Sequence, residues 1–189
     1  MIDVKDKKDS IRTIRELGLN FFPQDVFMAS DVEGFANFVK KYPSEEYVLR
    51  DASKAKGKFV YVKNLDEILA ALKNYSKDVT IAQSYRPFKE DLVLVGDIKV
   101  TRGVYGDVVD ITARDDAEAT QRNIYENPKY NMHASLEEDR LWNIPGFSKL
   151  MSYISEHELY GVILEFLVYD RKVGVNKENV VITEIRSNY

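Results

Sequence analysis

The sequence predicts an α+β protein in which a small N-terminal αβ lobe precedes a larger C-terminal lobe of antiparallel strands. In the first half, short helical patterns alternate with short apolar runs. Residues 91–100 and 104–114 are longer apolar runs joined by a three-residue turn, a pattern typical of a hairpin. Residues 162–169 and 180–188 form a second such pair near the end of the chain. A chain of 189 residues suffices for one domain, or for two small lobes that share a cleft.

The first element is a predicted helix over residues 6–17. Ile11, Ile14 and Leu17 recur at helical spacing, and Gly18 is a suitable stop. A loop with a short extended run is expected to follow.

Two further helices carry capping signals at their starts. Ser30 is the expected N-cap of one, with Glu33 completing a capping box, and Pro43 closes it. Asn64 is the expected N-cap of the other, again with a glutamate, Glu67, three residues later.

The strands of the first lobe are expected at residues 47–50, 58–62 and 79–85. The last of these runs into Arg86-Pro87, where a hinge is expected. The predicted division is an N-terminal lobe of residues 1–82, a hinge of residues 83–90 and a C-terminal lobe of residues 91–189.

Residues 115–145 are polar and weakly periodic, so the sequence predicts a long loop there. Loops of this length in compact domains are usually functional or disordered. A fourth helix is expected over residues 146–159, ahead of the last two strands.

Composition excludes several classes of function. The net charge of −4 gives no basic field for nucleic acid, which makes a nucleic-acid partner an unfavoured reading. Cysteine is absent, so no disulfide or zinc-thiolate site is expected. No apolar run approaches the roughly 20 residues of a membrane span, and the charged N-terminus lacks a signal core. We therefore expect a cytoplasmic protein without a membrane partner.

Glu165 and Glu184 each interrupt an apolar strand, where a buried carboxylate needs a compensating cation or hydrogen bonds. If the strands are antiparallel neighbours, the two side chains can face each other and, with Asn188, hold Mg²⁺ together with substrate phosphates. The alternative is that both glutamates point outward or pair with arginine or lysine.

A second candidate is a phosphate-binding turn that follows Arg50 at the end of a strand. Its lysines and backbone N–H groups would neutralise phosphate charge, although the spacing is not that of a Walker loop. The alternative is a solvated hairpin turn. The turn residues singled out are Ser53, Lys56, Gly57 and Lys58.

Gln83, Ser84 and Tyr85 end the strand that leaves the first lobe. Such a segment can offer backbone groups to a purine, but it can equally be a plain strand-to-loop exit.

Three arginines, Arg102, Arg114 and Arg186, carry permanently charged planar groups suited to phosphate or acyl-phosphate oxygens. A surface charge is the plainer interpretation of Arg102.

Taken in order, these pieces resemble the ATP-grasp superfamily over nearly the whole chain. No single motif is specific, and the succession carries the resemblance. The segments are DKKDSIRTIRELGLNFFPQDVF, EEYVLRDASKAKGKFVYVKNLDEILAAL, VTIAQSY, ELYGVILEFLV and VVITEIRSN.

The resemblance implies an ATP- and Mg²⁺-dependent carboxylate–amine (or similar) ligase that acts through an acyl-phosphate. Arg50 would contact the ATP phosphates, the turn 53–58 would cover them, and residues 83–85 would flank the adenine. Glu165 and Glu184, with Asn188, would hold Mg²⁺, and the three arginines would steady the acyl-phosphate. The substrate would be a small-molecule or peptide carboxylate.

Three departures from the family pattern favour a second hypothesis. Arg50 stands where the family usually has lysine, and Asn188 follows Glu184 by four residues instead of two. The usual N-terminal substrate lobe is also missing, so a partner protein could supply it. The second hypothesis is a non-catalytic nucleotide- or partner-binding module with a degenerate ATP-grasp fold.

Overall fold

The computed structural model describes residues 3–52, 59–116, 119–120 and 123–187. Its contacts divide the chain into two units, one formed by Met1–Phe21 with Phe88–Tyr189 and the other by Phe22–Pro87. Each unit contains one antiparallel sheet with helices, which confirms the α+β class. The first 21 residues thus lie with the C-terminal strands, whereas the sequence assigned them to the N-terminal lobe. Among the described residues, no helix is long and apolar enough to cross a membrane.

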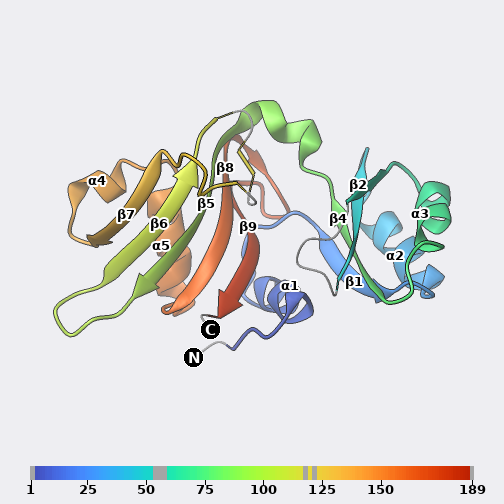
Figure 1. Cartoon of the computed structure of the whole chain (residues 1–189), viewed down its shortest axis with the longest axis horizontal. Coiled ribbons are helices and arrows are strands. Elements are labelled where there is room, and N and C mark those ends of the chain that lie inside the picture. The colour runs from blue at the N-terminus through green and yellow to red at the C-terminus, as the bar shows by residue number, and fades with distance from the viewer. Residues whose placement is uncertain (1–2, 53–58, 117–118, 121–122, 188–189) are drawn as a thin grey trace. The chain divides into compact units, whose positions relative to one another are not determined.

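The larger unit is built on a five-stranded sheet with the order β7-β6-β5-β8-β9, antiparallel throughout (Figure 1). Helix α5 packs on one face of this sheet. The elements are α1 (Lys7–Glu16), β5 (Leu92–Thr101), β6 (Val108–Arg114), β7 (Tyr130–Ser135), α4 (Asp139–Trp142), α5 (Phe147–Glu156), β8 (Val162–Val173) and β9 (Glu178–Ser187).

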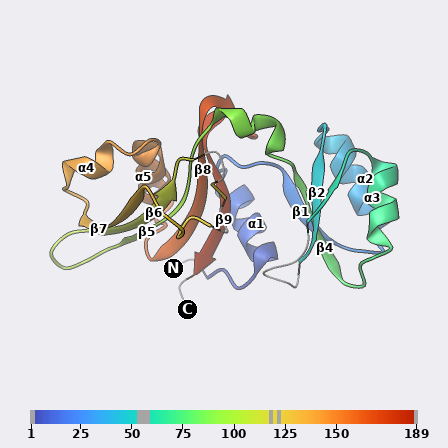
Figure 2. The same ribbon diagram turned by 45° about the horizontal axis from the view of Figure 1, so that its top comes forward.

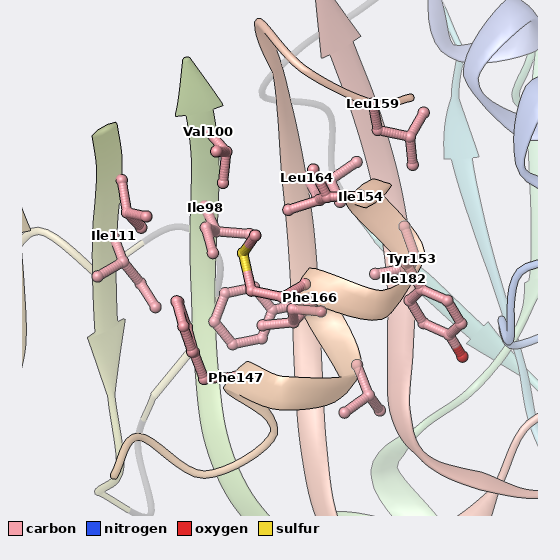
Figure 3. Packing of buried hydrophobic residues seen from close by; sticks show 14 of the residues in the cluster. Ile98, Val100, Ile111, Phe147, Tyr153, Ile154, Leu159, Leu164, Phe166 and Ile182 are labelled. Atoms are coloured by element: carbon pink, nitrogen blue, oxygen red, sulfur yellow. The ribbon is translucent and has the colours of Figure 1, made fainter. Parts of the chain in front are cut away.

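The core of the larger unit lies between α5 and the sheet. Figure 3 shows Phe147 and Ile154 of α5 directed at residues of the central strands, among them Ile98 and Phe166. Burying each of these large side chains stabilises the fold by about 1.5–3 kcal/mol. Gly96 faces the same core, and a Cβ atom there would lie 2.8 Å from Phe166 Cζ. The glycine therefore makes room for the phenylalanine ring of the neighbouring strand.

Helix α1 covers the edge strand β9, and the two lie side by side in Figures 1 and 2. Ile185 N–H donates to Ser10 Oγ over 2.8 Å, and Val4 N–H donates to Ser187 Oγ over 2.8 Å. The polar groups of an edge strand are thereby used by the same chain. This packing is the reason that residues 1–21 belong to the C-terminal strands.

The β8–β9 hairpin is fixed by one buried side chain, Asn20. Its Nδ2 donates to Val173 O over 3.0 Å and to Val180 O over 2.8 Å. Its Oδ1 accepts from Asn176 N–H over 2.9 Å. Gly174 adopts φ +75°, and a Cβ there would lie 2.5 Å from Asn20 Oδ1, so only glycine fits beside the amide.

The smaller unit has a four-stranded sheet with the order β1-β4-β2-β3 and two helices on one of its faces (Figure 2). Phe35, Phe38, Ile68 and Leu72 of the helices pack on Leu49, Val79 and Ile81 of the sheet. The elements are β1 (Gln24–Met28), α2 (Val32–Lys41), β2 (Tyr47–Asp51), β3 (Val60–Val62), α3 (Leu65–Leu72) and β4 (Asp78–Gln83).

The two predicted capping boxes have different outcomes. Asn64 is the N-cap of α3, since Glu67 N–H donates to its Oδ1 over 2.9 Å and Glu67 accepts from Lys63 N–H. The N-cap of α2 is Asp31 and not Ser30, because the Asp31 carboxylate accepts from Gly34 N–H over 2.9 Å. Both residue types are good caps, and carboxylates are further favoured by the helix dipole.

The prediction that residues 115–145 form one loop is wrong. The segment contains strand β7, which pairs with β6, and the short helix α4. Only Met132, Ala134 and Tyr130 of β7 contact the core, and the residues between them are polar. Alternation over a single short strand is a weak signal, and a pairing with β6 cannot be read from it.

Candidate functional site

Three carboxylates form a row across the larger sheet, on the face opposite α5. Asp97 of β5 pairs in register with Glu165 of β8, and Glu165 pairs with Glu184 of β9. Their neighbours Ile98, Leu164 and Ile185 belong to the core, so alternation directs the carboxylates to the other face. Directly paired side chains lie about 4.5–5.5 Å apart at Cβ. We call Asp97, Glu165 and Glu184 the carboxylate row.

Two cations of the same unit neutralise part of this row. Arg186 NH2 lies 3.0 Å from Glu165 Oε1 and 3.8 Å from Asp97 Oδ2. Lys7 Nζ lies 2.8 Å from Glu184 Oε2. Each carboxylate has a cationic neighbour, but three carboxylates and two cations give the group a formal net charge of −1 when all are ionised.

The segment that follows β6 also reaches the row. Tyr125 Oη donates a hydrogen bond to Asp97 Oδ2. The segment is anchored nearby by Arg114, whose Nε donates to Asp116 Oδ2 over 2.6 Å and whose NH1 donates to Asn123 O over 3.0 Å. Part of the predicted loop thus contributes a side chain to the site.

Burial makes the row electrostatically unfavourable without a further cation. Burial raises the pKa of Asp97, against the effects of the Tyr125 hydrogen bond and Arg186. The pKa of Glu165 is raised by burial and then by repulsion from Glu184, against the effects of Arg186 and Lys7. Burial and the bond to Asp97 raise the pKa of Tyr125 to about 12. Raised carboxylate pKa values mean that the folded protein gains stability from protonating the row, or from a cation that replaces the proton.

The donor chemistry of the row suits Mg²⁺ bound together with phosphate. Within the described residues, no group of three or more His, Cys, Asp or Glu side chains is arranged to hold a metal ion by itself. Glu165 and Glu184 would therefore supply two carboxylates, with phosphate and water oxygens completing the shell. Mg²⁺ is usually held by one or two carboxylates and substrate phosphates in this way.

The three arginines singled out in the sequence do not come together. Arg186 lies on the carboxylate row, and Arg114 is tied to the segment after β6. Arg102 lies beyond the end of β5, with its Cζ 3.8 Å from the ring centroid of Tyr160.

In the smaller unit, Arg50 and Thr80 are direct cross-strand neighbours on β2 and β4. Both lie on the face opposite the helices, since Leu49 and Ile81 fill the core side. Arg50 forms no ion pair with the residues that the structure describes, and it is half-buried. Thr80 is 3% exposed, and its Oγ1 has no hydrogen-bond partner in the same set of residues. A guanidinium and a buried hydroxyl side by side are donors suited to an anion.

Gln83 is the last residue of β4, and its N–H donates to Pro23 O over 2.8 Å. Ser84 is buried and bonded to Glu46, its Oγ donating to Glu46 Oε1 over 2.7 Å. Arg86 also pairs with Glu46, 3.5 Å away. The Ser84 hydroxyl therefore orients this segment, while Tyr85 follows it outside the strand. The predicted residues Ser53, Lys56, Gly57, Lys58 and Asn188 lie outside the described residues.

The sequence interpretation missed four residues of these two clusters. Asp97 interrupts the apolar run LVLVGDIKV as Glu165 interrupts its own, so the same signal could have found it. Lys7, Thr80 and Tyr125 had no such signal. Their roles depend on packing between segments far apart in the sequence.

Several solved structures are similar to this chain over nearly all of its length. D-alanyl-alanine synthetase A from Vibrio cholerae O1 biovar eltor is 9% identical, with a TM-score of 0.54 over 96% of this chain and 55% of that one. The ADP complex of N5-carboxyaminoimidazole ribonucleotide synthetase is 13% identical, with a TM-score of 0.57 over 99% of this chain and 45% of that one. The D-Ala:D-Ser ligase from Enterococcus faecalis is 11% identical, with a TM-score of 0.54 over 96% of this chain and 52% of that one.

These neighbours are ATP-grasp enzymes, so the chain has an ATP-grasp-like fold, as its sequence predicts. The chain spans about half the length of the structures it matches. No protein-family model and no curated protein matches the sequence.

Proposed function

We propose that this ATP-grasp-like chain is an ATP- and Mg²⁺-dependent ligase that joins a carboxylate to an amine or similar nucleophile through an acyl-phosphate. The observation that carries the proposal is the pairing of Glu165 with Glu184 in register on adjacent strands. Their cluster has a formal net charge of −1 when all its groups are ionised, which favours binding of a metal cation. ATP and Mg²⁺ are the proposed cofactors.

Each group has a defined task in this proposal. Glu165 and Glu184, with Asn188, hold Mg²⁺, which neutralises phosphate charge when bound. Arg186 is already within 3.0 Å of Glu165, and it steadies the phosphoryl group that passes to the substrate carboxylate. Positioning and charge neutralisation suffice for this chemistry, so no protein nucleophile is needed.

The nucleotide itself would be held by groups of the smaller unit. Arg50 and the turn residues Ser53, Lys56, Gly57 and Lys58 bind the phosphates, and Gln83, Ser84 and Tyr85 flank the adenine. Arg102 and Arg114 are weaker candidates for contacting the acyl-phosphate, since Arg102 stacks on Tyr160 and Arg114 anchors the segment after β6.

The acceptor of the phosphoryl group is a small-molecule or peptide carboxylate in this proposal. A partner protein that supplies a substrate lobe is part of this proposal. We place the activity in the cytoplasm.

A second candidate is a non-catalytic module that binds a nucleotide or a partner through a degenerate ATP-grasp fold. One observation favours it: Lys7 and Arg186 already compensate two charges of the carboxylate row. It differs from the ligase in one measurable respect, the absence of turnover.

A thermal-shift titration with Mg-ATP, Mg-ADP and ATP plus EDTA tests the shared premise. We expect a Tm increase that requires the metal, since binding at a hundredfold excess over Kd adds about 2.7 kcal/mol to the free energy of unfolding. ADP release with a panel of carboxylates and amines then separates the candidates. Metal-dependent binding without ADP release under any mixture would support the nucleotide-binding module. No Tm change at millimolar Mg-ATP would exclude the ligase and leave only the partner-binding form of the module.

Thr80→Val tests the phosphate-binding role of the smaller unit through two effects of opposite sign. A buried hydroxyl without a partner costs about 1–3 kcal/mol of stability. Valine has the same shape as threonine but lacks this hydroxyl, so the substitution removes the cost. We expect a higher Tm without ligand and about tenfold weaker Mg-ATP binding, as the loss of a bond to a charged group predicts. Thr80→Ser, which keeps the hydroxyl, is the control. Unchanged Mg-ATP affinity in Thr80→Val would remove Thr80 from the site.

A further inference from the structure

We infer that Lys7 is a built-in counter-ion of the carboxylate row, and that a divalent cation must displace its ammonium group from Glu184 in order to bind. The inference rests on the proposed function, because it concerns the same carboxylates. It adds a residue from the other end of the sequence and gives it a role in controlling access to the metal site.

The contacts of Lys7 join the first and last elements of the chain. Its Nζ lies 2.8 Å from Glu184 Oε2 and donates to Thr183 O over 3.2 Å. The strand pairing shifts register at this point, from Glu165 opposite Glu184 to Phe166 opposite Ile182. Thr183 is thus the extra residue of a bulge, and its carbonyl accepts a hydrogen bond from the ammonium. The side chain of Lys7 is only 14% exposed.

The position of Lys7 in its helix is unfavourable for a cation. Lys7 is the first residue of α1, where the helix dipole and the free N–H groups favour negative charge. Asp6 and Asp9 occupy this end in the expected way, with Asp6 accepting from Asp9 N–H. Attraction to Glu184 therefore outweighs a local preference against lysine.

The chain is hydrogen-bonded to β9 on both sides of Lys7, at Val4 ahead of α1 and at Ser10 within α1. Val4 N–H bonds to Ser187, and Ser10 accepts from Ile185 N–H, each over 2.8 Å. The backbone of Lys7 is thereby held beside Glu184, and only its flexible side chain has to move for the ammonium to leave.

The other cation is less readily displaced. Arg186 approaches two carboxylates at once, Glu165 and Asp97. The Lys7 ammonium contacts Glu184 Oε2 and the Thr183 carbonyl, and it competes with a metal ion for that same carboxylate oxygen. The Glu184 end of the row is therefore where cation exchange costs least. A free metal ion must compete with Lys7. A metal–nucleotide complex also brings phosphates, with which the displaced ammonium can form an ion pair.

Titration of nucleotide-free protein with Mn²⁺, followed by electron paramagnetic resonance of the unbound ion, tests the inference. We expect Lys7→Met to bind Mn²⁺ about tenfold more tightly than wild type, equivalent to about 1.4 kcal/mol. Lys7→Gln, of different shape, should show the same gain. Lys5→Met is the matched control, because it removes the same charge only two residues from Lys7. The Lys5 side chain is exposed, and its Nζ lies 3.8 Å from Asp3 Oδ2. The gain should disappear when Glu184→Gln is added to Lys7→Met.

Equal Mn²⁺ affinity in wild type, Lys7→Met and Lys5→Met would overturn the inference. So would the same gain in Lys5→Met as in Lys7→Met, because it would reflect net charge alone. The proposed function fails in a different measurement, the absence of a Mg-ATP-dependent Tm increase in wild type. If wild type responds to Mg-ATP but Lys7→Met binds Mn²⁺ no more tightly than wild type, the proposed function is retained and the competition by Lys7 is rejected.

Discussion

Glu184→Gln is expected to lose the Mg-ATP-dependent increase in Tm that we predict for wild type. The amide keeps the shape of the side chain but removes the charge that we propose binds Mg²⁺ next to Glu165. At a hundredfold excess of ligand over Kd, the stabilisation lost would be about 2.7 kcal/mol. The measurement is Tm with and without Mg-ATP, with EDTA added in parallel, and any ADP release should disappear with it.

Glu137→Gln is the control for this substitution. Glu137 belongs to the same unit, is exposed, and lies between β7 and α4. Its substitution should leave the Mg-ATP response as in wild type. A Glu184→Gln protein that still responds to Mg-ATP like wild type would show that Glu184 does not hold the metal, and ADP release at the wild-type rate would remove it from the proposed reaction.

The pairing of Glu165 with Glu184 was predictable because each is a carboxylate inside an apolar run, and the two runs are close neighbours in the sequence. Strands joined by a short connection pair antiparallel, so only the register was left open. Asp97 carries the same signal on β5. Its place in the row was missed because β5 pairs with β8 across 60 intervening residues (102–161), a connection that local patterns do not specify.

The compensation of the row was not predictable in the same way. The sequence raised a salt bridge to arginine or lysine as the alternative to a metal site, and the structure contains such bridges, from Arg186 and Lys7. Lys7 was out of reach because helix α1 was expected in the N-terminal lobe, whereas it packs on β9. A periodic apolar stripe indicates that a helix is buried, but it does not indicate against which strand.

Asn20→Ala is expected to produce the largest loss of stability among the substitutions considered. The variant leaves the carbonyls of Val173 and Val180 and the N–H of Asn176 without their side-chain partner. The bonds to the two carbonyls are buried, and buried groups left unsatisfied cost about 1–3 kcal/mol each, so a total loss of about 2 kcal/mol or more is expected. The chain's single tryptophan, Trp142, lies in the same unit, so its fluorescence during urea unfolding reports this change.

Asn20→Asp separates the hydrogen bonds from the volume of the side chain. Aspartate fills the same space but has no N–H donor, and it places a negative charge beside the Val173 and Val180 carbonyls. It should therefore destabilise at least as much as alanine, whereas a pure packing role predicts that aspartate is tolerated. Asn143→Ala, at an exposed asparagine that bonds Asp139 O over 3.4 Å, should change the unfolding midpoint little. Because Asn20 bonds both strands of the hairpin that carries Glu165 and Glu184, its loss is expected to weaken Mg-ATP binding as well, which couples the stability of the hairpin to the geometry of the carboxylate row.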